Sequence, residues 1–208
     1  MNHPVTKKTS VTGLQLNSDK TSISLDLTQV SASEHFFFAN AFMVKKEGGQ
    51  IFCVFGGSSR FKTSIVFDRA VEIVLPIDAA RSFLVVNVWD APSSSGVGTF
   101  IQSLMTEVAR VGALNTEVPI SSQVTYGMPE NPDNLRMFPS NVAIPSFAAG
   151  QAMLEFFEAA PGVIANLMAG RMARPNDGVS NLLAVIMDPK TLYEFLEKLK
   201  IELGFKPV

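Results

Sequence analysis

The stretch Gly-Gly-Ser-Ser-Arg-Phe-Lys-Thr-Ser over residues 56–64 is the part of the sequence that comes closest to a phosphate-binding loop. The motif G-x-x-x-x-G-K-[ST] is matched at three of its fixed positions, by Gly56, Lys62 and Thr63. Phe61 stands where the motif needs glycine, because the loop turns tightly and brings its backbone N–H groups close to the phosphates. The motif must also open a helix, whereas residues 64–67 have the pattern of a strand. The sequence therefore predicts a polar loop here and no nucleotide site.

The same loop has a second spacing that is associated with catalysis. Ser59 and Lys62 form an S-x-x-K pair, which in serine acyl-transfer enzymes lets a lysine amine face the nucleophilic hydroxyl across one helical turn. Gly56 and Gly57 disfavour a helix, and no K-T-G or S-D-N sequence follows. We keep an enzyme with a loop-built site near Ser59, Lys62 and His35 as the alternative hypothesis.

Metal and acid–base chemistry find little support in the sequence. The two histidines, His3 and His35, have no H-E-x-x-H context and no paired cysteines, so no zinc site is predicted. Glu155 and Glu158 lie three residues apart on an expected helix and are interpreted as its solvated face. We assign no catalytic, cofactor-binding or metal-binding residues.

The charges and the single cysteine limit the classes of partner and compartment. Cys53 lies in an apolar run and is expected to be a buried thiol. Seventeen basic and 19 acidic residues are scattered along the chain, so we expect no nucleic-acid partner. No apolar stretch reaches the ~20 residues of a transmembrane helix, and no secretory signal is recognised. We expect a cytoplasmic protein.

The surface is expected to be poor in charge. Charged residues make up 17% of the chain, below the ~25% of average globular proteins, whereas 47% of the residues are hydrophobic. Such a composition fits either a larger core or an apolar surface that other subunits cover. Both interpretations stay open.

The first half of the chain is expected to be rich in strands. Residues 1–20 are a flexible arm or a loosely attached first strand, and 21–27 alternate as a half-buried strand. Residues 35–44 predict a strand in which Phe37 points away from its two phenylalanine neighbours, so both of its faces must be covered. Hairpins are expected at residues 45–49, with two glycines, and at Asp68–Arg69. For residues 78–84 a helix is expected to begin, although the valines that follow favour extended backbone.

The second half is expected to be richer in helices. After a linker at 91–98, helical spacing predicts a helix over 101–111 capped by Gly112, then a region with a possible strand at 118–126. Helices are predicted over 146–160 and 162–173, separated by Pro161. A buried strand at 182–187 leads into a helix that begins at Asp188 and Pro189 and ends at Gly204. Tyr193 and Ile201 fall outside its apolar stripe and indicate a second contact surface.

Two offsets hint at an internal duplication. An offset of 101 aligns Asn40 with Asn141, and an offset of 112 aligns residues 75–83 with 187–195. The helical interpretation of 148–159 argues against it, because its counterpart at 50–55 is expected to be a strand.

The segment over about 36–86 resembles a family of small, functionally uncharacterised bacterial domains. The residues that carry the resemblance include 38–44, 54–56, 74–76, Ala80 and Phe83. The resemblance implies a strand-rich body closed by a helix, and no activity.

These observations predict an α+β fold, with an antiparallel sheet, helices packed on it and the option of two related halves. We expect an arm at 1–20, a strand-rich half at 21–90 and a helix-richer half at 99–208, which can share one domain. Function is inferred by elimination as a non-enzymatic assembly or interaction protein that self-associates as a homo-oligomer. The candidate partner contacts are Arg60, Lys62, Phe37, Tyr193 and Ile201.

Overall fold

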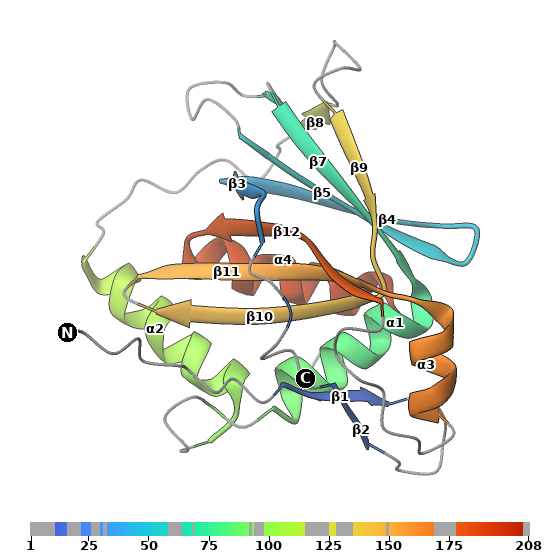
Figure 1. Ribbon diagram of the computed structural model, residues 1–208. Helices are drawn as coiled ribbons and strands as arrows, with labels where there is room; N and C mark the ends of the chain where they lie inside the picture. Colours follow the sequence, from blue (N-terminus) through green and yellow to red (C-terminus); the bar gives the residue numbers. More distant parts are fainter. Residues whose placement is uncertain are drawn as a thin grey trace, which may run out of the picture.

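The protein is described here by a computed structural model (Figure 1). It describes residues 11–15, 22–25, 30, 33–57, 64–67, 69–91, 93, 98–114, 125–127, 135–148, 150–168 and 178–205. Two four-stranded sheets share one hydrophobic core with the helices, so the expected α+β class is confirmed. Where one antiparallel sheet was expected, there are two, and each is antiparallel except for one parallel edge strand.

The first sheet, called the β5 sheet, has the strand order β4-β5-β7-β9. Its strands are β4 (Ala41–Glu47), β5 (Gln50–Gly57), β7 (Arg69–Pro76) and β9 (Leu135–Pro139). The second, called the β11 sheet, has the order β10-β11-β12-β3. Its strands are β10 (Val142–Ala148), β11 (Gln151–Ala159), β12 (Val179–Met187) and β3 (Phe36–Phe38).

The two halves of the chain have the same strand plan. The register pair Val74–Pro139 of the β5 sheet becomes the pair Ile186–Phe38 of the β11 sheet when β7 is shifted by 112 residues and β9 is shifted back by 101. The same offsets take the pair Ile51–Leu75 to Ala152–Met187. These are the two offsets seen in the sequence, so two halves of related plan are present.

Each half gives its first strand to the other half's sheet. Between β3 and β4 the chain leaves one sheet for the other: the Ala39 N–H donates to the Ile186 carbonyl at 2.9 Å and the Asn40 N–H donates to the Gly56 carbonyl at 3.1 Å. Ser140 and Asn141 make the equivalent bonds in the second half, to the carbonyls of Val74 and Phe157. The prediction of one strand over 35–44 is therefore wrong, because the chain changes sheets at its centre (Figure 1).

The hairpin predicted at 45–49 is confirmed. Its two central residues are Gly48 and Gly49, with φ angles of 56° and 82°. Positive φ at both positions is the requirement of the type I′ turn, whose twist matches that of the flanking strands. The hairpin predicted at Asp68–Arg69 is wrong, because β6 (Ser64–Val66) pairs in parallel with β8 (Thr125–Gly127) and not with β7.

The chain stays helical where extended backbone was an open alternative. Helix α1 (Ile77–Ser82) continues into η1 (Phe83–Trp89), a π-helix in which the backbone hydrogen bonds span five residues. The Asp90 N–H, for example, donates to the Val85 carbonyl at 2.8 Å. The side chain of Asn87 is buried and its Nδ2 donates to the Ala143 carbonyl at 2.9 Å, which ties η1 to β10.

The last helix, α4 (Pro189–Glu202), begins and ends as the sequence predicts. The Asp188 carboxylate accepts hydrogen bonds from the Thr191 N–H at 2.9 Å and from the Thr191 hydroxyl at 2.6 Å. Gly204 has a φ of 78° and ends the helix. Two ion pairs at a spacing of four residues lie along the helix: Glu194 lies 3.9 Å from Lys190, and Lys198 lies 2.8 Å from Glu202.

Two other helical predictions need correction. Helix α2 (Phe100–Leu114) runs past Gly112, which therefore does not cap it. The helix predicted over 146–160 is wrong, because the segment contains the end of β10 and all of β11, and α3 (Pro161–Met168) follows. In β11 burial alternates with a period of two, so Glu155 and Glu158 lie on a strand, where Glu155 accepts a hydrogen bond from Asn181 Nδ2 at 3.1 Å.

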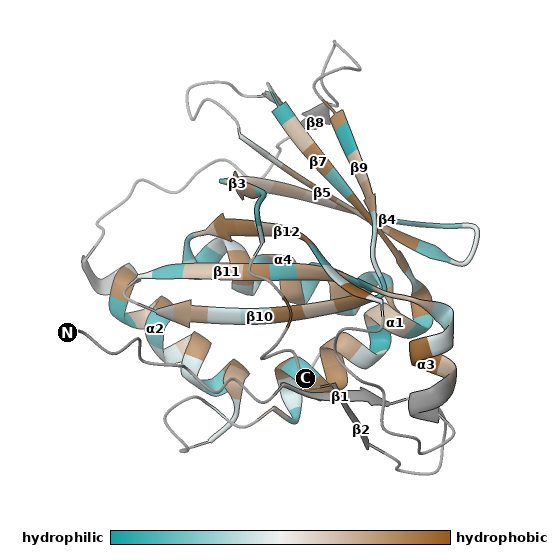
Figure 2. Cartoon of the chain, viewed as in Figure 1, coloured by the Kyte–Doolittle hydropathy of each residue, from teal (hydrophilic) through white to brown (hydrophobic). Residues whose placement is uncertain are grey.

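One core joins both sheets to α1, η1, α2 and α4. At its centre the Phe55 ring lies 5.9 Å from the Phe156 ring and 5.0 Å from the Phe195 ring, so the two halves and α4 meet there. Figure 2 shows the hydrophobic residues concentrated along the central strands and hydrophilic ones at the β4–β5 hairpin. The apolar stripe predicted for α4 is buried in this core; its members are Leu192, Phe195, Leu196, Leu199 and Leu203.

Strands β1 (Val11–Gln15) and β2 (Ser22–Leu25) form a separate antiparallel pair. For residues 11–15 the structure therefore has the strand that was one of the two expectations for the start of the chain. Among the described residues, no helix combines the length and the hydrophobicity needed to cross a membrane.

Candidate functional site

The exchanged strands β3 and β9 carry large hydrophobic side chains that are exposed: Phe36, Phe38 and Met137. On β3, Phe37 is partly buried against the core, whereas Phe36 is 55% exposed and Phe38 is 69% exposed. On β9 the pattern is the same: Phe138 packs against the core and Met137 is 60% exposed. The strand alternation thus sends one set of side chains between the sheets and one set outward.

The outward set on β3 continues across the β11 sheet. The register places Phe38 beside Ile186, and Ile186 beside Met153, on one face of the sheet. Phe36 is beside Ala184, which is buried. We call Phe36, Phe38, Ile186 and Met153 the outer patch. It combines two exposed phenylalanines with two half-buried aliphatic side chains.

Other parts of the outer sheet faces are covered. On the β5 sheet, the buried Phe67 packs with Ala41, Val54 and Ala70. On the β11 sheet, Ile164 of α3 packs on a group of buried residues, together with Val30 and Val179. In the described part of the chain neither cover reaches the outer patch, because Phe36 and Phe38 remain exposed.

A hollow of about 450 Å³ lies on the inner side of the same two strands. Its apolar wall includes Phe37 and Phe138, which the offset of 101 makes equivalent, and Val71 and Leu183, which the offset of 112 makes equivalent. The hollow therefore lies where the two halves meet around their approximate two-fold axis. We call it the central hollow.

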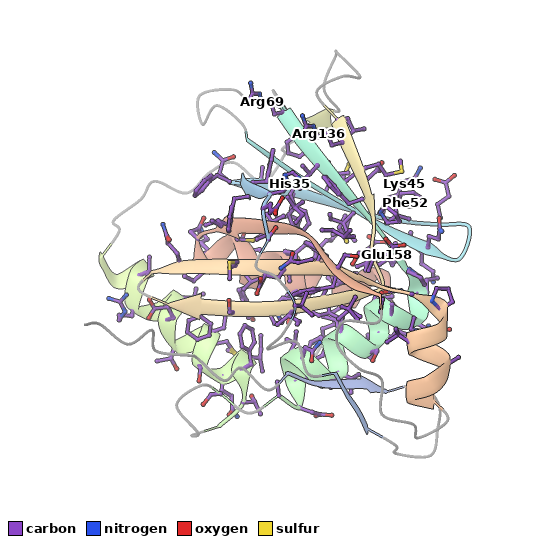
Figure 3. All side chains as sticks on the ribbon, in the orientation of Figure 1. His35, Lys45, Phe52, Arg69, Arg136 and Glu158 are labelled. Carbon is purple, nitrogen blue, oxygen red and sulfur yellow. The ribbon has the colours of Figure 1, made fainter. Side chains whose placement is uncertain are left out.

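Three basic side chains line the central hollow: His35, Arg69 and Arg136 (Figure 3). Arg69 stands at the start of β7, Arg136 is on β9, and His35 immediately precedes β3. The acidic side chain that lines it is Glu34. Within the part of the chain that the structure describes, neither arginine makes an ion pair.

A second hollow of about 420 Å³ lies at the other end of β3, between Phe38, Gly57, Gly150 and Asp188. Its polar side chains include Asp188, and that carboxylate is already occupied as the N-cap of α4. The other polar side chains that line it belong to Asn40 and Gln151.

The structure places the predicted contact residues unevenly. Ile201 is 59% exposed on α4, as a contact residue requires, whereas Tyr193 is half-buried against the core. Phe37 faces the core, so its exposed neighbours Phe36 and Phe38 present the aromatic surface that was expected of this strand. Arg60 and Lys62 lie outside the described residues, as does Ser59, so the enzyme hypothesis retains only His35 in a described site.

Cys53 is buried, as predicted, and lies in the core face of β5. Burial raises the pKa of its thiol well above the usual range, and the nearby Glu72 carboxylate adds to this. The described residues contain no group of three or more His, Cys, Asp and Glu side chains that could hold a metal ion.

The sequence did not single out Arg69, Arg136 or Met137 as site residues. Arg69 was interpreted as a turn residue, and β9 lay outside the strands and helices that were expected. The signal that was present is the offset of 101, which aligns His35, Phe36 and Phe37 with Arg136, Met137 and Phe138.

Comparisons with family models, with curated proteins and with solved structures found no match for this chain.

Proposed function

We propose that this chain is a non-enzymatic assembly or interaction protein, and that it self-associates through the outer patch on β3, β12 and β11. The observation that carries the proposal is the exposure of Phe36 and Phe38 side by side on one face of a short edge strand. Exposed phenylalanines that are adjacent on a sheet mark surfaces that other proteins cover.

The position of β3 supports this proposal. Among the strands that the structure describes, β3 is at the edge of the β11 sheet and pairs with β12 alone. An edge strand with exposed hydrophobic side chains is a template for pairing with another chain. A second copy that approaches this edge would bury the phenylalanines of both chains in an isologous contact.

The low charge of the chain also supports self-association. Charged residues make up 17% of the sequence. On the β11 sheet, the cross-strand neighbours that continue the outer patch over β12, β11 and β10 are apolar apart from Glu155 and Ser146. Arg60 and Lys62 stay candidate contacts with an acidic partner surface, and Ile201 stays a candidate contact on α4.

A single buried cysteine is compatible with a reducing compartment, and we propose the cytoplasm.

Sedimentation velocity over a hundredfold range of protein concentration tests the proposal. We expect the wild-type chain to form a dimer or larger oligomer, and the double variant Phe36→Ser, Phe38→Ser to remain monomeric with an unchanged circular dichroism spectrum. Met105→Ser is the matched control, because Met105 is also exposed, at 51%, but lies on α2.

Two results would contradict self-association through this patch. One is a wild-type chain that is monomeric at every concentration. The other is an oligomer that the double variant retains in full. Loss of the oligomer in Met105→Ser alone would move the contact to α2.

A further inference from the structure

We propose that the central hollow binds a small organic carboxylate with an apolar body, such as a medium-chain fatty acid or an aryl carboxylate. This site is on the inner side of β3 and β9, although Phe36 of the outer patch is also among its lining residues, and the proposal does not depend on self-association. Three features of the molecule support this site: the register of β7 and β9, the charges around the hollow and the apolar side chains beneath them.

The register places the two arginines on one face of the β5 sheet. Arg136 is the partner of Val71, and Arg69 precedes Val71 by two residues, so all three side chains point to the same side. Arg69 and Arg136 are therefore diagonal neighbours, with Cβ atoms on the order of 7 Å apart. Figure 3 shows both at the ends of their strands, above the region of His35.

Like charges on diagonal neighbours repel each other, and an anion that binds both would relieve this repulsion. Glu34 supplies one negative charge to the lining of the hollow, against two positive charges and a histidine. A carboxylate fits this arrangement because its two oxygens accept the parallel N–H groups of arginine, and two arginines can hold one carboxylate from both sides. The geometry therefore favours a compact, planar anion at the rim.

The side chains at the base of the hollow indicate which chemistry the uncharged part of the ligand must have. Phe37, Phe138 and Leu183 belong to or pack on the main core, and they supply the apolar part of a lining that is otherwise largely polar. A volume of about 450 Å³ lies within the ~300–1,000 Å³ typical of small-molecule sites. An apolar body of roughly six to ten carbons would fill this space and displace water from it.

Inorganic phosphate and nucleotides fit the site less well. Phosphate would use the arginines but leave the hydrocarbon floor wet, and the chain carries a net charge of −2 that disfavours polyanions. The charge at the rim and the apolar floor have to be satisfied by the same molecule. Three simple probes separate the contribution of the charge from that of the apolar body.

The experiment titrates the full chain, labelled with ¹⁵N, with octanoate, octan-1-ol and inorganic phosphate, and follows the backbone amides by NMR. We expect octanoate to shift the amides of residues 35–37, 69–71 and 136–138 in a saturable way. Octanol, with the same tail and no charge, and phosphate, with charge and no tail, should each bind at least about tenfold more weakly. Equal affinity for octanol or for phosphate would overturn the proposal.

Variants then assign the charge. Arg69→Gln with Arg136→Gln should weaken octanoate binding by about tenfold or more, because both partners of the carboxylate are lost. Lys46→Gln with Arg81→Gln is the control, since it removes two positive charges from exposed positions on β4 and α1 and should leave the affinity unchanged.

Octanoate that shifts none of these amides at millimolar concentration would overturn the site, and so would an unchanged affinity in the arginine double variant. If that variant does not fold, the single variant Arg136→Lys replaces it, because lysine keeps the charge and loses the paired N–H geometry. A decrease in affinity of severalfold is expected there, and no decrease would again contradict the proposal.

Discussion

The Lys200 ammonium lies 5.2 Å from the centre of the Trp89 ring, at the place where α4 meets the end of η1. Lys200 is only 6% exposed, and its ammonium is 3.7 Å from the Glu197 carboxylate. The Trp89 ring also lies 6.0 Å from the Phe205 ring. A buried positive charge is thus held between an aromatic face and one carboxylate, which links the helices that close the two halves.

Replacing Lys200 with alanine should lower the free energy of unfolding by about 2 kcal/mol, because the cation–π contact and the packing of the aliphatic stem are both lost. Lys200→Met keeps the stem and should cost less than half as much. Urea denaturation followed by the fluorescence of Trp89, the only tryptophan, measures both. Lys198→Ala, at an exposed position, is the control; equal costs for all three variants would mean that the contact with Trp89 contributes little.

Gly56→Ala should destabilise the protein by about 1–3 kcal/mol, because a Cβ atom there would lie 1.8 Å from Cδ1 of Phe67. Phe67 is 1% exposed, so its ring is enclosed by the protein. Gly57→Ala is the matched control, since its Cβ would meet nothing within 4 Å. Thermal unfolding measured by circular dichroism distinguishes the two.

Phe67→Leu in the Gly56→Ala background makes the test sharper. The smaller side chain should recover part of the stability lost by Gly56→Ala, because it relieves the overlap. If the two single variants are strictly additive, the close approach of Gly56 to the Phe67 ring is not the cause of the loss.

Cys53 should not react with a thiol reagent in the native protein and should react fully in urea, because it is buried and its pKa is raised. The folded thiol stays protonated while the unfolded thiol ionises near pH ~8.5. The stability that depends on the neutral thiol is therefore complete below that pH and is lost above it, by about 1.4 kcal/mol per pH unit.

Comparison of the wild type with Cys53→Ala between pH 7 and 10 isolates this effect, because the other titrating groups are common to both chains. The variant is expected to be less stable at pH 7, owing to the cavity that it creates, and the difference should narrow as the pH rises. A difference that does not change with pH would show that Cys53 does not ionise differently in the two states.

Local chemistry explains which elements could be predicted from the sequence. The Asp188 cap, Pro189 and Gly204 define α4 through contacts within a few residues, and Gly48 and Gly49 define the first hairpin in the same way. The strand β11 was missed because residues 151–159 contain alanine, methionine, leucine and glutamate, which are good helix formers. Pairing with β10 and β12 overrides that local preference, and no short-range signal reports it.

The candidate sites were harder to predict for the same reason. The three phenylalanines of β3 showed that a strand with two apolar faces was present, but only the pairing with β12 shows which face is left exposed. Arg69 and Arg136 are far apart in the sequence and become neighbours through the parallel pairing of β7 with β9. The two arginines become neighbours because the halves exchange strands. The offsets indicated two related halves but did not specify this exchange.

The exchanged strand β3 has a consequence for the synthesis of the protein. Phe36 leaves the ribosome long before its partner Ala184, and at about 5–20 residues per second the wait is on the order of ten seconds. Until then the β11 sheet cannot close, so the newborn chain keeps three consecutive phenylalanines without their native partner strand. We expect these residues to be the segment of the nascent chain that most needs a chaperone.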